Sequence, residues 1–194
     1  MTQRIREAMR RDPMASLLAG AVVADETWIG GSPKNKHGKG PGKGVTTKTP
    51  VLSLISVSTG EARSVVVPNV TGETLGPILR AQVDPSATVL HTDSSNAYKQ
   101  VGPEMVRHET TNHFIGQYVG PTGSTTNPAE GFFSQLKRSI DGTHHHVSVE
   151  HLPRYLAEFD YRFTTREMTD GQRMQSLMFQ TDRRLSYRPL TGGA

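Results

Sequence analysis

Cysteine is absent from the 194-residue sequence, and so is any long hydrophobic run. The lack of cysteine excludes disulfide bonds, cysteine-ligated zinc and a thiol nucleophile, and it is compatible with a cytosolic setting. No apolar stretch approaches the roughly 20 residues of a membrane-spanning helix, so no membrane partner is expected. Residues 1–7 are charged, and the short apolar run after them is not a signal peptide.

What the sequence does contain is ample glycine and proline and a small excess of positive charge. Its 19 glycines and 12 prolines, beside a hydrophobic fraction of 34%, indicate long loops. A chain of 194 residues is still long enough to bury one substantial core. The net charge of +4 favours a polyanionic partner only weakly, because many proteins without such a partner share it.

Hydrophobic periodicity and turn residues predict an alternation of strands and helices. From residue 169 onward the sequence is polar and arginine-rich, with a weak helical pattern to about residue 185. The order of elements predicts an α/β fold, a mixed sheet flanked by helices. Strands are expected at 21–29, 51–57, 62–67, 87–92 and 105–109, and helices at 3–18, 71–83, 96–101, 128–140 and 149–166.

Two aspartates stand within or directly after predicted strands. Asp25 lies in the first strand, where side-chain alternation places it on the opposite face from Glu26. Asp93 follows the fourth strand, at a carboxyl end where sheet enzymes commonly carry catalytic groups. Each also has a plain structural explanation. Asp25 would be a strand-edge acid that pairs with a lysine or caps a turn, and Asp93 would cap the helix that contains Tyr98.

A third acid opens an amphipathic helix. Asn127 and Pro128 suit an N-cap and a first turn, and Glu130 follows in that turn. Lys137 comes seven positions after Glu130, about two turns at 3.6 residues per turn, so both project from one face. Taken singly, Glu130 is a first-turn acid favoured by the helix dipole, and Lys137 is a solvated charge.

The combination of three acids predicts a metal site. Two or three carboxylates can hold Mg²⁺ ions that activate a nucleophile and stabilise a leaving oxygen in phosphoryl transfer. Because the metal supplies the nucleophile, no serine or histidine nucleophile is required. The predicted ligands are Asp25, Asp93 and Glu130.

Three sequence blocks surround these acids. They read ADETWIGG at 24–31 followed by KNKH at 34–37, then TDSSNAY at 92–98, then NPAEGFFSQLKR at 127–138 with GTHHHVS at 142–148 and LPRYL at 152–156. In this order and spacing, over roughly residues 3–168, the chain resembles bacterial insertion-sequence transposases of the ISXO-like group.

The resemblance implies an RNase H-like fold and DDE-type chemistry. It assigns Asp25, Asp93 and Glu130 as the first, second and third ligands of Mg²⁺ or Mn²⁺, and Lys137 as a lysine that contacts DNA. Asn127 competes for the third position, because some members have Asn in the catalytic set. The two candidates stand 34 (127 − 93) and 37 (130 − 93) positions beyond Asp93. A carboxylate is the stronger Mg²⁺ ligand, which favours Glu130.

The sequence departs from the family pattern in two respects. Ser94 stands where the family often has an acid, which should not remove the metal site if Asp93 is the ligand. Full members carry an N-terminal zinc-ribbon and helix-turn-helix region that this sequence lacks, so we expect a catalytic domain, a truncated element or a fragment. The expected division is the end of an N-terminal helical segment at 1–20, the RNase H-like catalytic domain at 21–168 and a polar C-terminal tail at 169–194.

The expected partner is double-stranded DNA, as element ends and as target, bound by a homo-oligomer at the nucleoid of the bacterial cytoplasm. Lysines of the loop 32–49 can follow a DNA backbone without reading its sequence, although a solvated loop is the plain alternative. The adjacent histidines at 144–146 make a poor zinc site, because zinc ligands are usually spaced. The expected DNA contacts are Lys34, Lys36, Lys39, Lys43, Lys137 and Arg138.

The sequence therefore predicts a DNA transposase that carries out metal-dependent strand cleavage and strand transfer of an insertion sequence. Two alternatives stay open. One is a plain RNase H-like metal nuclease without strand transfer, and the other is an inactive or truncated DNA-binding remnant of a transposase. The missing N-terminal region favours the remnant, whereas the intact Asp25, Asp93 and Glu130 oppose it.

Overall fold

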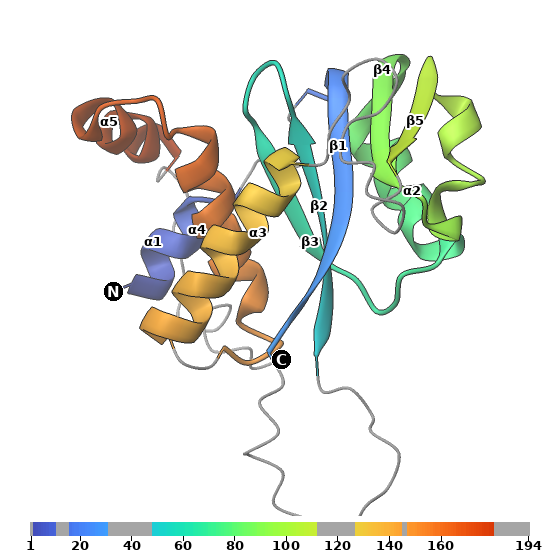
Figure 1. Ribbon diagram of the computed structural model, residues 1–194. Helices are drawn as coiled ribbons and strands as arrows, with labels where there is room; N and C mark the ends of the chain where they lie inside the picture. The colour runs from blue at the N-terminus through green and yellow to red at the C-terminus, as the bar shows by residue number, and fades with distance from the viewer. Residues whose placement is uncertain (1, 11–15, 31–47, 112–126, 145–146, 181–194) are drawn as a thin grey trace, which may run out of the picture.

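The fold is built on a five-stranded mixed sheet, seen in a computed structural model that describes residues 2–10, 16–30, 48–111, 127–144 and 147–180. The strands span Leu18–Ile29 (β1), Thr49–Ser56 (β2), Ala62–Val66 (β3), Val83–Asp93 (β4) and Arg107–Thr111 (β5). Their order in the sheet is β3-β2-β1-β4-β5 (Figure 1). The central strand β1 pairs antiparallel with β2 and parallel with β4. The β2–β3 pair is antiparallel and the β4–β5 pair is parallel.

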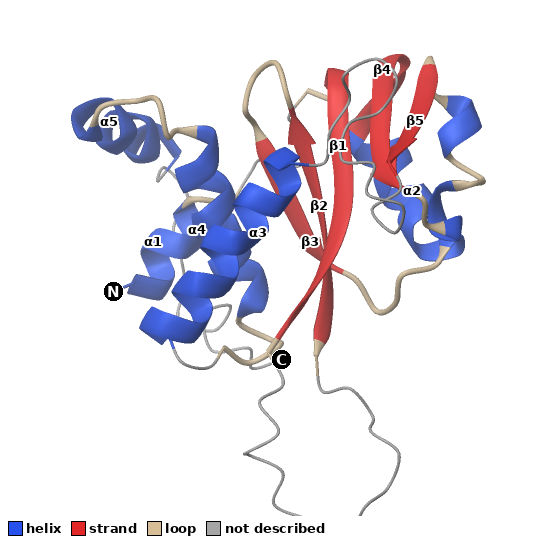
Figure 2. Ribbon diagram, viewed as in Figure 1, coloured by secondary structure: helices blue, strands red, loops and turns tan. Residues whose placement is uncertain are grey.

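Helices cover both faces of this sheet. On one side lie α1 (Thr2–Ala8), α3 (Asn127–Ser139) and α4 (Leu152–Thr164), with α5 (Asp170–Gln180) beyond them, and on the other side lies α2 (Gly72–Gln82) (Figure 1). Figure 2 shows the red sheet between the blue helical layers. The predicted α/β fold, a mixed sheet flanked by helices, is confirmed. None of the helices in the described ranges has the length and hydropathy of a membrane span.

Side-chain alternation along β1 divides the interior into two cores. Val22 points to the face covered by α2, in a cluster with Leu79 and Tyr98. Val23 points to the opposite face, in a cluster with Phe132 and other residues of α3 and α4. All five side chains are at most 2% exposed. Consecutive residues of β1 therefore face different cores.

The apolar stripes predicted for α3 and α4 are confirmed. Their members recur at the spacing of one helix face, so burying them fixes how each helix is rotated about its axis. The rotation of α3 in turn decides which of its polar side chains face the sheet. The stripes consist of Phe132, Phe133, Leu136 and Ile140 on α3 and the turn after it, and of Tyr155, Leu156, Phe159 and Phe163 on α4.

The predicted helix at 3–18 is wrong in its bounds. The helix α1 ends at Ala8, and Leu18 already belongs to β1, where it pairs with Val83. Leu18 is 3% exposed, so this last residue of the predicted helix is instead a core residue of the sheet. Gly20 has a φ of +77° beside a register shift in β1. That left-handed conformation favours glycine.

Two contacts made by α4 tie distant parts of the chain together. Arg6 of α1 donates from Nε to Glu158 Oε2 at 2.6 Å, and both side chains are at most 10% exposed. Asp160 accepts hydrogen bonds from the backbone N–H and the hydroxyl of Ser64, at 2.7 and 2.6 Å. Ser64 lies in the edge strand β3, so Asp160 satisfies an edge donor that would otherwise be open to another strand.

Candidate active site

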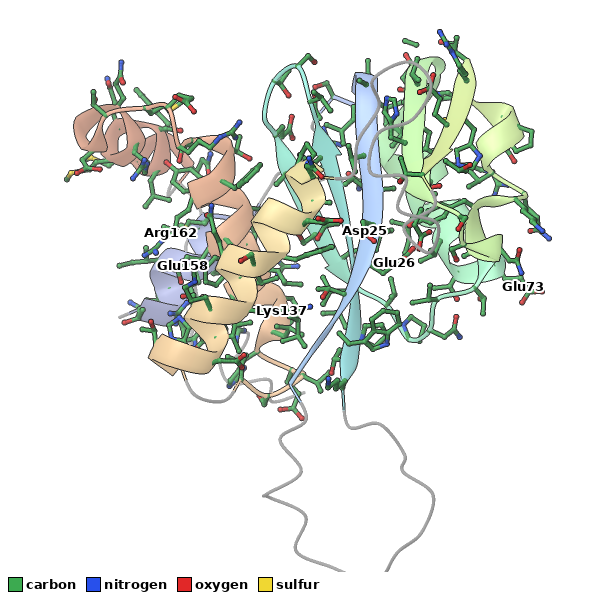
Figure 3. All side chains as sticks on the ribbon, viewed as in Figure 1. Asp25, Glu26, Glu73, Lys137, Glu158 and Arg162 are labelled. Carbon is green, nitrogen blue, oxygen red and sulfur yellow. The ribbon has the colours of Figure 1, made fainter. Side chains whose placement is uncertain are left out.

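A pocket of about 370 Å³ opens between the second half of β1 and the sheet-facing flank of α3. The α3 residues that line it follow the i, i+3, i+4, i+7 spacing of one helix face. Figure 3 labels Asp25 and Glu26 next to each other on β1, with Lys137 on the sheet-facing side of α3. The pocket is lined by Asp25, Glu26, Thr27, Glu130, Phe133, Ser134 and Lys137.

The parallel pairing of β1 with β4 brings Asp93 level with Asp25. Val23 is paired with His91, an offset of 68 residues (91 − 23), and the same offset joins Asp25 to Asp93 (93 − 25). Both aspartates are the second residue beyond that pair, so both leave the sheet on the face of Val23. That is the face covered by α3. Two carboxylates thus stand on neighbouring strands, on the face of the sheet that is covered by α3, the helix of Glu130.

The plain explanation of Asp93 as a helix cap is wrong, and Asp25 does not lie in an edge strand. The strand β1 lies between β2 and β4, so Asp25 is not a strand-edge residue. The short 3-10 helix Asn96–Tyr98 is capped by Ser95, whose hydroxyl accepts the N–H of Ala97 at 3.3 Å. Asp93 instead accepts the N–H of Ser95 through Oδ1 at 2.9 Å, which holds its carboxylate at the end of β4.

Glu26 is a candidate that the sequence interpretation missed. It lines the pocket, and its carboxylate accepts a hydrogen bond from the hydroxyl of the fully buried Tyr98. Burial raises the pKa of Glu26 to about 7; the bond from Tyr98 opposes this rise, and the charges of Asp93 and Asp25 add to it. Burial, with the charge of Glu26, also raises the pKa of Tyr98 well above its usual value. The signal in the sequence was the adjacent acid pair Asp25-Glu26.

The two competing third ligands occupy different places on α3. Asn127 is the first residue of the helix and is not among the described residues that line the pocket. Glu130 lies about one turn further on and lines it together with Asp25 and Lys137. Glu130 and Lys137 thus share one helix face, as their seven-residue spacing predicted. The placement supports Glu130 as the group that reaches a ligand in the pocket.

The predicted DNA contacts fall into three groups. Lys137 lines the pocket beside Asp25. Arg138, the next residue, points to the other flank of α3 and lines a second pocket between α3 and α4. The loop lysines Lys34, Lys36, Lys39 and Lys43 lie outside the described residues.

The donor set suits a divalent cation with oxygen ligands. Mg²⁺ commonly takes one or two protein carboxylates together with water and phosphate oxygens, which Asp25 and Asp93 match. Burial is the main cause of the raised pKa of Glu26, and the negative charges of Asp93 and Asp25, which a bound cation would offset, add to it. Over the described ranges, no three Asp, Glu, His or Cys side chains converge closely enough to hold one ion. The geometry therefore fits a cation held by the two aspartates, with Glu130 across the pocket.

Comparison with known proteins gives a family match over most of the chain. A family model described as ISXO2-like transposase domain matches residues 17–164, which run from the start of β1 to the end of α4. A relative from Haemophilus influenzae, named an uncharacterized transposase-like protein, is 30% identical over 105 residues. That alignment covers 54% of this chain and 82% of the relative.

Two solved structures are also similar to the chain. One is the catalytic core domain of BIV integrase, with a TM-score of 0.44 and 13% identity, covering 70% of this chain and 79% of that one. The other is the simian T-cell lymphotropic virus intasome in complex with PP2A regulatory subunit B56 gamma. Its TM-score is 0.45 at 14% identity, and the match covers 79% of this chain and 50% of that one.

Proposed function

Because the chain belongs to the ISXO2-like transposase domain family, we propose that it is a DNA transposase that cleaves and transfers DNA strands. Its substrates would be the ends of a mobile element and a target, both double-stranded DNA. One observation carries the proposal. Asp25 and Asp93 each lie two residues beyond the Val23–His91 pair of the neighbouring parallel strands, and Asp25 lines a pocket together with Glu130 and Lys137.

Each residue has a role that follows from its place. Asp25 and Asp93 would hold Mg²⁺ or Mn²⁺, and Glu130 of α3 would have to move closer to them to join as the third ligand. When bound, such a cation lowers the pKa of a water ligand and neutralises phosphate charge. Lys137 would contact a phosphate oxygen from the opposite wall of the pocket as a point charge. The hydrogen bond from Tyr98 orients the Glu26 carboxyl next to this set.

The reaction would be an in-line attack on a phosphodiester, first by water and then by a DNA 3′-hydroxyl. The pocket offers positioning and charge neutralisation, and the proposed chemistry uses no side-chain nucleophile. Among the described residues that line the pocket, Lys137 is the one cation, and three are acids, Asp25, Glu26 and Glu130. A bound phosphate would therefore be oriented by Lys137 and by whatever cation the carboxylates hold.

Cleavage of supercoiled plasmid tests this proposal. The purified protein should nick it with Mg²⁺, and Asp93→Asn should reduce the rate by more than about 100-fold, since losing groups that only support metal ligands costs about 10–100-fold. Glu73→Gln is the matched control, because it removes an exposed carboxylate from α2 on the other side of the sheet. Nicking that persists in Asp93→Asn would refute the assignment.

The third ligand is tested by a pair of variants. Glu130→Gln should abolish nicking, whereas Asn127→Ala should retain it, because Glu130 lines the pocket with Asp25 and Asn127 does not. The reverse pattern would make Asn127 the third ligand.

A plain metal nuclease of the same fold is the second candidate, since the carboxylates and Lys137 would serve hydrolysis alone. Joining of pre-cleaved ends to a target separates the two, because a nuclease cuts without joining. A non-catalytic DNA-binding remnant would do neither. The division at residues 20 and 168, the homo-oligomer and the DNA contacts of the loop lysines stay predictions.

A further inference from the structure

A second pocket, of about 430 Å³, lies on the other flank of α3, between α3 and α4. Its floor holds Phe132 and Phe159, which are 2% and 8% exposed, with the partly buried Phe163 beside them. None of the described residues that line it is acidic. Its cationic residues are Arg138, Arg162 and Arg166.

The guanidinium of Arg166 is held flat over an aromatic ring. Its Cζ lies 4.4 Å from the centroid of the Phe163 ring, and its Nη1 donates to the carbonyl oxygens of Phe163 and Gly60 at 2.8 and 3.0 Å. Phe163 in turn meets Phe132 edge-on, with centroids 5.3 Å apart. The Arg166 side chain is still 43% exposed. Part of the guanidinium is therefore accessible to a ligand while it rests on the Phe163 ring.

The pocket has more positive charge than its neighbouring acids balance. Arg162 is 61% exposed and pairs with Glu158 through Nη2 at 2.9 Å. The same Glu158 carboxylate is also bound by an arginine of α1 at 2.6 Å, so one negative charge serves two cations. Arg166 approaches Glu167 only at 3.5 Å, and that carboxylate is 89% exposed. An anionic ligand would compensate this excess.

The helix α3 forms the ridge between the two pockets. Glu130 and Lys137 line the candidate active site, whereas Phe132 and Arg138 line the second pocket. Figure 3 labels Lys137 on the sheet side of α3 and Arg162 on the α4 side. An α-helix is about 10–12 Å across, and a DNA strand rises about 3.4 Å per nucleotide. A strand crossing α3 therefore reaches the second pocket about three nucleotides from the first.

We infer that the second pocket binds an unpaired nucleotide of the DNA strand whose phosphodiester lies in the candidate active site. Its base would stack on the Arg166 guanidinium above Phe163, and its phosphate would contact Arg138 and Arg162. A paired base is already stacked within the duplex, and an acidic peptide lacks a planar ring to stack. The Arg166 guanidinium on the Phe163 ring therefore favours an unpaired nucleotide over a paired base and over an acidic peptide. The inference rests on the proposed function in taking DNA as the ligand.

Fluorescence anisotropy in EDTA tests the pocket without any cleavage step. The probes are a fully paired duplex, the same duplex with a single-stranded extension of about three nucleotides, and that extension made of abasic sites. Wild type should bind the extended duplex about tenfold more tightly than the other two, since stacking one base contributes about 1–3 kcal/mol. Extensions at 3′ ends and at 5′ ends are measured separately, and a preference for either supports the inference.

Three variants locate the effect. Arg166→Lys keeps the charge but loses the planar guanidinium, and Phe163→Leu keeps an apolar side chain but loses the ring. Each should remove most of the preference for the extension. Lys99→Ala removes an exposed charge directly after Tyr98, whose side chain lies in the core on the α2 face, and should retain the preference. Arg166→Lys changes only a partly exposed side chain, so it keeps the test valid if Phe163→Leu fails to fold.

Equal affinity of wild type for all three DNAs would overturn the inference, as would a preference that survives both Arg166→Lys and Phe163→Leu. Displacement of the probe by a polyglutamate peptide, but not by single-stranded DNA, would assign the pocket to an acidic protein and would also overturn it. Asp93→Asn separates this inference from the proposed function. The preference should persist in that variant while cleavage is lost. If wild type cleaves DNA but shows no preference for the extended duplex, only the inference about the second pocket is refuted. If wild type shows that preference but does not cleave DNA, only the proposed transposase function is refuted.

Discussion

Replacing Glu26 by glutamine should stabilise the protein at neutral and alkaline pH. The Glu26 carboxyl is largely buried beside Asp25 and Asp93, and burial is the main reason that its pKa rises from 4.5 to about 7. Ionising this group in the folded protein therefore carries a cost that the unfolded chain does not have. At about 1.4 kcal/mol for each pH unit, the difference between the two pKa values corresponds to about 3 kcal/mol.

The sign follows from which state has the higher pKa. Because folding raises the pKa of Glu26, its protonated form contributes stability that is fully present below pH 4.5 and is lost as the pH rises to about 7. Glutamine resembles the neutral acid and can still accept the hydroxyl of Tyr98. The free energy of unfolding of Glu26→Gln, relative to wild type, should therefore increase by about 3 kcal/mol between pH 4.5 and about pH 8.

Urea unfolding at the two pH values measures this difference, in EDTA so that no divalent cation binds. Circular dichroism can follow the transition, together with the fluorescence of Trp28, the one tryptophan of the chain. Glu73→Gln removes an exposed first-turn carboxylate and should change the free energy by less than about 1 kcal/mol at either pH. If the effect of Glu26→Gln is the same at both pH values, the carboxyl is not desolvated and the reasoning is refuted.

Three further predictions concern the packing and the metal site. Arg6→Met should lower the free energy of unfolding in urea by about 1–3 kcal/mol, because Glu158 then keeps only Arg162 as a partner. Arg4→Met, at an exposed position, should have little effect. Equal effects of the two variants would show that the buried Arg6–Glu158 pair adds no stability. Asp160→Ala should cost about 1–3 kcal/mol and increase self-association in analytical ultracentrifugation, since it opens the edge of β3, and unchanged behaviour in both would contradict this role. Mg²⁺ should raise the Tm of wild type but not of Asp93→Asn, and equal shifts would place the ion elsewhere.

The sheet and the two aspartates could be predicted because their signals are local. Asp25 follows buried valines inside one strand, and Asp93 closes another after a short apolar run. Their side-by-side placement needed only parallel pairing of those strands, which the observed register supplies. The prediction made the first helix too long for the same reason. A local pattern of apolar residues cannot show whether Leu18 packs within a helix or within a sheet.

The role of Glu26 could not be predicted from its neighbours. Alternation correctly separated it from Asp25, but its partner Tyr98 comes 72 residues later and reaches it only after the core on the α2 face has formed. The second pocket was missed for a related reason. Arg162 and Arg166 look like solvated helix charges in the sequence, and they meet Arg138 only because α4 packs beside α3.

The apolar stripe of α3 determines both pockets at once. Phe132 and Leu136 fix the rotation of the helix by burying one face, and successive residues along a helix point about 100° apart. Lys137 and Arg138, adjacent in sequence, are therefore directed to opposite flanks, one beside the carboxylates and one beside the aromatic floor. Turning the helix by one residue, about 100°, would move Glu130 and Lys137 off the pocket that they share with Asp25. Core packing, rather than any contact among the charged groups, thus places a carboxylate pocket and an arginine pocket on the two sides of one helix.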